Sequence, residues 1–138
     1  ANFRAGYLIA SAENIAQISK IRNPKNFTTF TQEAVIAVLS DVAYMRKYVD
    51  EVLKARDYFE EKLKGSPLIK NIFPSQGNFV LVEFSDFDIK MKVYNGLSDH
   101  NIFVRNLMHS KLLMNTLRIT IGTREQMERV IKVIDTIQ

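Results

Sequence analysis

The stretch 117–134, LRITIGTREQMERVIKVI, decides the fold because a strand, a turn and a helix follow one another in it. Residues 117–121 alternate apolar and polar side chains, which is typical of a strand with one buried face. Gly122 turns the chain, and Thr-Arg-Glu-Gln at 123–126 has the spacing of a helix capping box. Apolar residues then recur at three- and four-residue steps and give the helix one buried face. That face consists of Met127, Val130, Ile131 and Ile134.

Working outward from this stretch, the chain from residue 41 alternates helices and strands. A long helix is predicted at 42–63, with apolar residues on one face and charged residues on the other, and Gly65 ends it. The other predicted elements are a weak strand at 69–73, a strong strand at 79–84, a helix capped by Ser85 or Asp86, and a strand at 101–105. The order predicts an α/β (α+β) fold: a long helix and a small, mainly antiparallel sheet with helices packed on one face.

The first forty residues have a different pattern. The run at 6–11 suits a buried strand, and its start so close to residue 1 favours a cut within a longer protein. Ser11 is expected to cap a helix that Asn23-Pro24 ends. Residues 29–32 have capping-box spacing and are expected to begin a second helix, which breaks at Ser40-Asp41.

Composition narrows the class of protein. The 138 residues are 46% hydrophobic and 25% charged, which is ordinary for a soluble globular protein. There is no cysteine, so disulfides and thiolate chemistry are excluded, as suits a cytoplasmic protein. No apolar run reaches the roughly 20 residues of a membrane span. The net charge is +4, but basic residues alternate with acidic ones, as at 60–64, which disfavours nucleic-acid binding.

Three arginines and two histidines are the residues to which chemistry could be assigned. Arg118 lies inside a strand between apolar neighbours, where a guanidinium either meets an anion or points to the solvated face. Arg105 ends its strand, and Arg4 precedes the opening strand. From the residues alone, a solvated surface side chain is the simpler interpretation of each. His100 and His109 have no cysteine or carboxylate at ligand spacing, so we expect no metal site.

Five stretches carry a resemblance to a known family when they are taken in order. They are Phe-Arg-Ala-Gly-Tyr at 3–7, Arg-Asn-Pro at 22–24, Pro-Ser-Gln-Gly-Asn-Phe at 74–79, Asn-Ile-Phe-Val-Arg at 101–105 and Leu-Arg-Ile-Thr-Ile-Gly-Thr-Arg-Glu at 117–125. The set resembles the histidinol-phosphate aminotransferase branch of the fold-type I enzymes, which depend on pyridoxal phosphate. One departure is Asn101, which stands where the family usually has glycine.

The resemblance implies a role for each arginine and a division of the chain. Arg4 matches the arginine that binds the cofactor phosphate, whereas Arg118 and Arg105 match the arginines that bind the acidic group of the substrate. Residues 1–40 would be the end of the large cofactor-binding domain with the connection between domains, and 41–138 the C-terminal small domain. The lysine that carries the cofactor would lie upstream of Ala1, so this chain would hold no catalytic residue.

The resemblance also implies an activity for the intact protein. It would be a cytoplasmic, homodimeric enzyme that uses pyridoxal 5′-phosphate to transfer an amino group between a phosphorylated or acidic amine and a keto acid. It would have neither nucleic-acid nor membrane partners, and this chain alone would be inactive. Two alternatives remain open: a phosphothreonine-type decarboxylase of the same fold, and a non-catalytic domain used for interaction.

Overall fold

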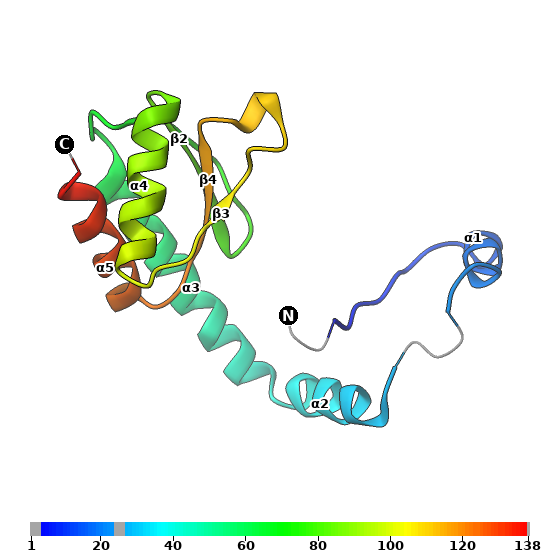
Figure 1. Cartoon of the computed structure of the whole chain (residues 1–138). Coiled ribbons are helices and arrows are strands. Elements are labelled where there is room, and N and C mark those ends of the chain that lie inside the picture. The colour runs from blue at the N-terminus through cyan, green and yellow to red at the C-terminus, as the bar shows by residue number, and fades with distance from the viewer. Residues whose placement is uncertain (1–3, 24–26, 138) are drawn as a thin grey trace. The chain divides into compact units, whose positions relative to one another are not determined.

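The computed structural model describes residues 4–23 and 27–137, which divide into two compact units (Figure 1). The first unit is Ala1–Arg46 and the second is Lys47–Gln138, so the division falls within the long helix α3, Val42–Leu63. Phe3, which belongs to the first of the five stretches, and the loop at 24–26 lie outside the described residues. Among the described helices, none is both long and apolar enough to span a membrane.

The second unit is built on a four-stranded antiparallel sheet, as the sequence predicts. Its strands are β1 (Ile69–Phe73), β2 (Phe79–Phe84), β3 (Arg105–Asn106) and β4 (Thr116–Thr120), in the order β1-β2-β4-β3. A loop with the short 3₁₀ helix η1 (Lys111–Leu113) joins β3 to β4. β2 alternates buried residues with exposed or half-buried ones, and β4 alternates from Leu117 onward, so the helices cover one face of the sheet. Thr116, the first residue of β4, is also buried, and its Oγ1 donates to the Leu113 carbonyl of η1.

Three helices cover that face. The second half of α3 contributes Ala55, Phe59 and Leu63 to the core, and α4 (Phe87–Asp99) and α5 (Arg124–Asp135) pack beside it (Figure 1). The predicted buried face of α5 is confirmed. The predicted apolar face of α3 is buried only in its second half. The other core residues are Val80, Val82, Phe84, Val93, Leu97, Leu117, Ile119, Ile121, Met127, Val130, Ile131, Val133 and Ile134.

Local hydrogen bonds fix where α4 and α5 begin. Of the two predicted caps for α4, Asp86 is the one used: its Oδ1 accepts a hydrogen bond from the Ile89 backbone N–H at 2.8 Å. The capping box that begins α5 is confirmed, since Thr123 Oγ1 accepts from the Gln126 backbone N–H and Gln126 Oε1 accepts from that of Thr123. Gly122 is required before this box because a side chain there would collide with the Gln126 amide.

The strand predicted at 101–105 is largely wrong, because only its last residue, Arg105, lies in β3. Asn101 has a φ of 57° and ends α4 in the left-handed conformation, while the Ile102 N–H donates to the Leu97 carbonyl at 2.8 Å. The preceding helix therefore uses the first of these residues for its own C-terminal cap. Asn101 has the backbone conformation that glycine adopts most easily, which explains why asparagine can replace the glycine usual in the family.

In the first unit, α1 (Ala12–Ser19) and α2 (Thr29–Ser40) form as expected, but the opening strand does not. Residues 4–10 belong to no strand, and Tyr7 is 91% exposed. A strand needs a neighbouring strand for its backbone hydrogen bonds, and none of the described strands pairs with this segment. Ser11 caps α1 as predicted, but the helix ends at Ser19 and not at Asn23-Pro24. Thr28, and not Thr29, caps α2 through the Thr31 N–H at 3.1 Å.

Candidate functional site

The open face of the sheet holds Arg118. Its neighbours on β4, Leu117 and Ile119, are buried against the helices, and the alternation of the strand from Leu117 to Thr120 exposes Arg118 on the opposite side. On β2 its partner is Leu81, which is half-buried on the same face. The structure therefore gives Arg118 the orientation that both interpretations of the sequence require, toward the uncovered face, where it can meet solvent or a ligand.

Arg105 lies directly opposite Arg118. The two residues are Cα partners in the antiparallel pair of β3 and β4, and both are exposed. Directly opposite residues have Cβ atoms roughly 4.5–5.5 Å apart and share one face. Like charges on directly opposite residues repel each other, and an anion bound by both side chains would reverse that cost. The sequence could not establish this pairing, which brings the two residues together as neighbours across adjacent strands.

Phe79 completes this face and was missed by the sequence analysis. The guanidinium carbon of Arg118 lies 5.2 Å from the centre of the Phe79 ring, a cation–π contact that orients the side chain. The turn before β2 holds Phe79 in place, since Ser75 Oγ donates to the Phe79 carbonyl at 2.6 Å. The alternation of β2 would have been a signal, because it puts Phe79 on the same face as Leu81.

Lys90 is a second residue that the sequence analysis missed. It lies on α4 and is fully buried, and its Nζ donates to Asn106 Oδ1 at 3.1 Å. Burial lowers the pKa of Lys90 below its ordinary value of 10.5, because the charged form loses hydration. Asn106 follows Arg105 on β3, so this contact joins the helix layer to the strand that holds one arginine of the pair.

Arg4 belongs to the first unit, so the pairing of the predicted site residues involves only Arg105 and Arg118. Arg4 is exposed and has a φ of 49°, in the segment 4–10, which has no regular structure. Among the described residues, none forms an ion pair with it. Its guanidinium donors suit a phosphate, which is the group that the resemblance assigns to it.

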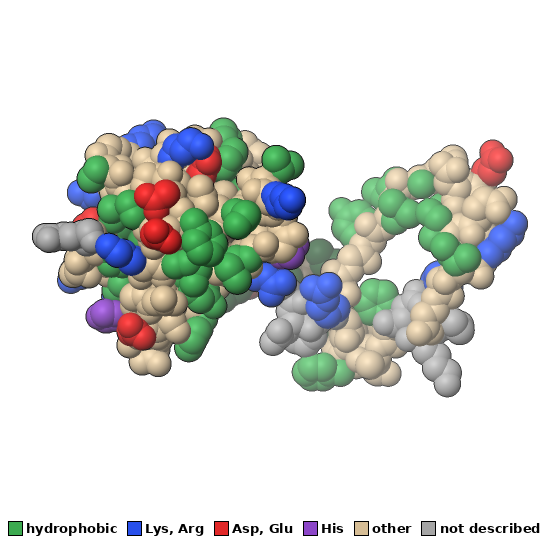
Figure 2. Space-filling model, turned by 45° about the horizontal axis from the view of Figure 1, so that its top comes forward, with side chains coloured by type: hydrophobic (Ala, Val, Ile, Leu, Met, Phe, Trp, Pro, Cys, Tyr) green, Lys and Arg blue, Asp and Glu red, His purple; other side chains and the backbone are tan. Residues whose placement is uncertain are grey.

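Acidic and basic side chains are mixed over the surface that Figure 2 shows. In Figure 2, Lys and Arg side chains and Asp and Glu side chains are scattered over the face in view and do not gather into one basic patch. Within residues 4–23 and 27–137, no three His, Cys, Asp or Glu side chains are grouped as metal ligands. His100 contacts the Gly96 carbonyl through Nδ1 at 2.8 Å, at the C-terminal end of α4.

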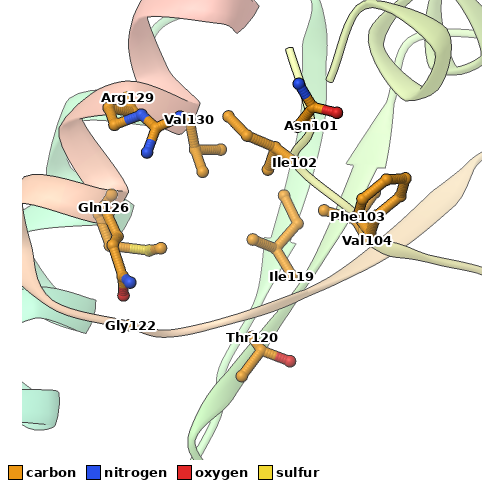
Figure 3. A pocket seen from close by; sticks show the side chains of 11 residues that line it. Asn101, Ile102, Phe103, Val104, Ile119, Thr120, Gly122, Gln126, Arg129 and Val130 are labelled. Atoms are coloured by element: carbon orange, nitrogen blue, oxygen red, sulfur yellow. The ribbon is translucent and has the colours of Figure 1, made fainter. Parts of the chain in front are cut away.

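A separate cavity of about 310 Å³ opens between the loop at 101–104, the end of β4 and α5 (Figure 3). Its wall includes Ile119, which points toward the helices and away from the neighbouring Arg118. Arg129 is the one charged residue that lines it, and Gln126 already accepts the Thr123 N–H in the capping box. This cavity is mainly apolar and does not include the arginine pair.

Comparisons with known proteins agree with the predicted fold and family. Dihydroxyacetone phosphate transaminase of Campylobacter jejuni is 42% identical over 134 residues, which cover 94% of this chain and 35% of that protein. Histidinol-phosphate aminotransferase of Geotalea uraniireducens is 38% identical, over 96% of this chain and 37% of that protein. The crystal structure of histidinol-phosphate aminotransferase from Clostridium acetobutylicum has a TM-score of 0.76 and 25% identity, over 89% of this chain and 37% of that one.

The chain thus spans a little over a third of the length of the relatives that it matches. The likeness to the solved structure confirms the predicted fold as part of a fold-type I aminotransferase. The family model for aminotransferase class I and II matches residues 1–134, nearly the whole sequence. The chain belongs to the aminotransferase class I and II family.

Proposed function

We propose that the full-length protein is a pyridoxal-phosphate-dependent aminotransferase that moves an amino group between a phosphate-bearing amine and a keto acid. The observation that supports it best is the cross-strand pair of Arg105 and Arg118 on an uncovered sheet face. Two guanidinium groups opposite each other match a dianion, and each can donate two hydrogen bonds to phosphate oxygens. The two relatives compared above are both named for phosphate-bearing substrates, which favours phosphate as the recognised group.

Arg118 and Arg105 orient the substrate in this proposal and do not themselves move protons. They hold the acidic group at one end, so that the amine at the other end reaches the reacting position. The contact with Phe79 restricts Arg118 before the substrate arrives, which lowers the entropy lost on binding. The same arginines would hold the carboxylate of the amino-acid partner in the other half of the reaction.

Arg4 is the residue of this chain that we assign to the phosphate of the cofactor, and its chemistry suits that group. Arg4 is an exposed guanidinium with no ion-pair partner among the described residues, so its donors are available to a phosphate. When bound, pyridoxal phosphate withdraws electrons from the substrate carbon that loses a proton. We expect the lysine that carries the cofactor upstream of Ala1, and therefore expect this chain alone to be inactive.

The remaining parts of the proposal concern the whole protein. Residues 41–138 would be its small domain, and 1–40 the end of its large domain with the connection between the two. We further propose that the enzyme is a cytoplasmic homodimer whose partners are small-molecule amines and keto acids.

The test compares a phosphorylated amine with its dephosphorylated counterpart, using the full-length protein loaded with pyridoxal phosphate. We expect amino transfer to a keto acid, with kcat/KM for the dephosphorylated amine reduced by two orders of magnitude or more, about what the loss of a buried charge pair costs. Inorganic phosphate should compete with the phosphorylated amine. Release of carbon dioxide without amino transfer would favour the decarboxylase alternative, and equal rates for both amines would contradict phosphate recognition.

A further inference from the structure

Lys90 is a buried cation with no acidic partner among the residues that the structure describes. Its side chain is 0% exposed, and its Nζ contacts Asn106 Oδ1 at 3.1 Å, Met91 Sδ at 3.4 Å and the Phe87 ring centre at 4.4 Å. No carboxylate among the described residues lies within ion-pair distance of it. A charge buried in this way costs folding free energy, and a methionine would occupy similar space without that cost. The lysine therefore calls for an explanation other than stability.

Its main partner, Asn106, lies on a short strand at the edge of the sheet. β3 is an edge strand of two residues, and the segment before it, 102–104, belongs to no strand. The Asn106 amide directs both of its polar atoms at α4: Oδ1 accepts from Lys90, and Nδ2 lies 3.7 Å from Met91 Sδ. A lysine ammonium is only a donor, which fixes the orientation of the amide. The helix thus anchors the strand through one side chain.

Arg105 and Asn106 are consecutive residues of β3, so their side chains point to opposite faces of the sheet. Asn106 meets Lys90 on the helix side, whereas Arg105 faces Arg118 on the open side. Lys90 is therefore separated by the sheet from any ligand of the arginine pair, and it can act on that ligand only through the strand.

We propose that Lys90 is a positioning residue for substrate recognition: by holding Asn106 it fixes Arg105 in register opposite Arg118. This inference rests on the proposed function, in which the two arginines bind the substrate phosphate. The hydrogen bond has to be strong for this purpose, and a charged donor provides a stronger one than a neutral donor would. The repulsion between the two arginines, which tends to separate β3 from β4 when no anion is bound, gives the anchor a specific task.

The first experiment replaces the lysine in the full-length enzyme. Lys90→Met should raise KM for the phosphorylated amine about tenfold and leave kcat nearly unchanged, because it weakens ground-state and transition-state binding alike. The absorbance of the bound cofactor and kcat/KM for the dephosphorylated amine should stay at their wild-type values. Lys92→Met is the matched control: it removes the same charge from an exposed position of the same helix and should leave KM unchanged.

A double-mutant cycle separates positioning from a general structural effect. If Lys90 acts through Arg105, Lys90→Met should raise KM much less when Arg105 is already alanine than in the wild type. Additive effects of the two substitutions would overturn the inference. Asn106→Asp, which keeps an acceptor for Lys90, should retain a KM close to the wild-type value, whereas Asn106→Leu should reproduce the defect of Lys90→Met.

The outcomes distinguish this inference from the proposed function. If Arg105→Ala leaves KM for the phosphorylated amine unchanged, the proposed function fails, and the inference with it. If Arg105→Ala raises KM and Lys90→Met does not, only the inference is overturned. Should Lys90→Met fail to fold by circular dichroism, the double variant Lys90→Met/Asn106→Leu replaces both partners with apolar groups and is expected to fold. A folded double variant with wild-type KM would equally overturn the inference.

Discussion

Arg105 and Arg118 are Cα partners across the antiparallel pair of β3 and β4, and both side chains are exposed on the face of the sheet opposite α3, α4 and α5. Like charges in this relationship destabilise a sheet by about 0.2–1 kcal/mol, so the pair opposes the folding of the unit that contains it. A ligand that carries the opposite charge converts this cost into binding free energy. The consequences of the pair can therefore be measured both with and without an anion.

The first prediction concerns the stability of the chain without an anion. Arg105→Gln should raise the free energy of unfolding by about 0.2–1 kcal/mol in a low-salt buffer without phosphate, because it removes the repulsion on Arg118. Urea denaturation of both forms measures the difference, which should shrink as salt screens the exposed charges. Added phosphate should stabilise the wild type more than the variant, since only the wild type has the complete pair.

Arg124→Gln serves as the control for this prediction. Arg124 is also exposed, but its Nε lies 3.2 Å from Glu128 Oε1 and its guanidinium lies over the Tyr58 ring. Removing it should lower stability slightly or leave it unchanged. If Arg105→Gln and Arg124→Gln had the same effect, with no response to phosphate in either, the pair would be two independent surface side chains.

The second prediction concerns catalysis by the full-length enzyme. In the proposed function, Arg118→Ala removes a charge-assisted, bidentate contact with the substrate anion, and we expect this to cost about 2–5 kcal/mol, or roughly 30- to 4,000-fold in kcat/KM. Steady-state kinetics with the phosphorylated amine measure the loss. Arg118→Lys should restore activity only partly, because an ammonium lacks the planar fork and stacks less well on Phe79. Cofactor affinity should be nearly unchanged, since Arg4 is the residue assigned to the cofactor phosphate.

Much of this site follows from strand periodicity. The alternation in 117–121 predicts that Arg118 points away from the core, and β4 confirms this orientation. Lys90 could also have been found, because Lys90, Val93 and Leu97 have helical spacing and the latter two are apolar. A lysine in register with core residues indicates a buried charge, which is a stronger signal than composition offers.

Other features depend on contacts between distant residues, and the sequence predicts them poorly. The run at 6–11 has the composition of a buried strand, yet it forms none, because strand formation requires a partner that the described residues do not provide. The pairing of Arg105 with Arg118 depends on the register of β3, which a two-residue strand cannot encode in a pattern. The predicted strand at 101–105 failed because the cap of α4 competes for its first residues.

The third prediction tests that cap. Asn101 has a φ of 57°, a conformation that costs most residues about 1–2 kcal/mol but costs glycine nothing and asparagine less. Asn101→Ala should therefore lower the free energy of unfolding by about 1 kcal/mol, and Asn101→Gly should leave it equal or slightly higher. Urea denaturation of the wild type and of the two variants measures their free energies of unfolding and so ranks them. An alanine variant as stable as the wild type would contradict the left-handed cap.

The fourth prediction is a pH dependence that comes from Lys90. Burial lowers the pKa of this lysine in the folded chain below 10.5, the ordinary value that it regains on unfolding. Below the lowered pKa both states carry the proton, so the folded state bears the full cost of desolvating the charge. Between the two pKa values the unfolded state binds more protons, and stability must rise with pH. Above 10.5 the lysine is neutral in both states, and the cost is gone.

Lys90→Met isolates this effect, because every other titrating group is shared by the two forms. The free energy of unfolding of the wild type minus that of the variant should increase as pH rises through the window that ends near 10.5. Neutral lysine can still donate an N–H to Asn106 Oδ1, so the anchor on β3 persists while the desolvation cost disappears. Urea denaturation of both forms at a series of pH values measures the difference. If the difference between the two free energies of unfolding does not change with pH, the Lys90 ammonium is as well hydrated as one at the surface. Lys90 could then not be treated as a buried charge.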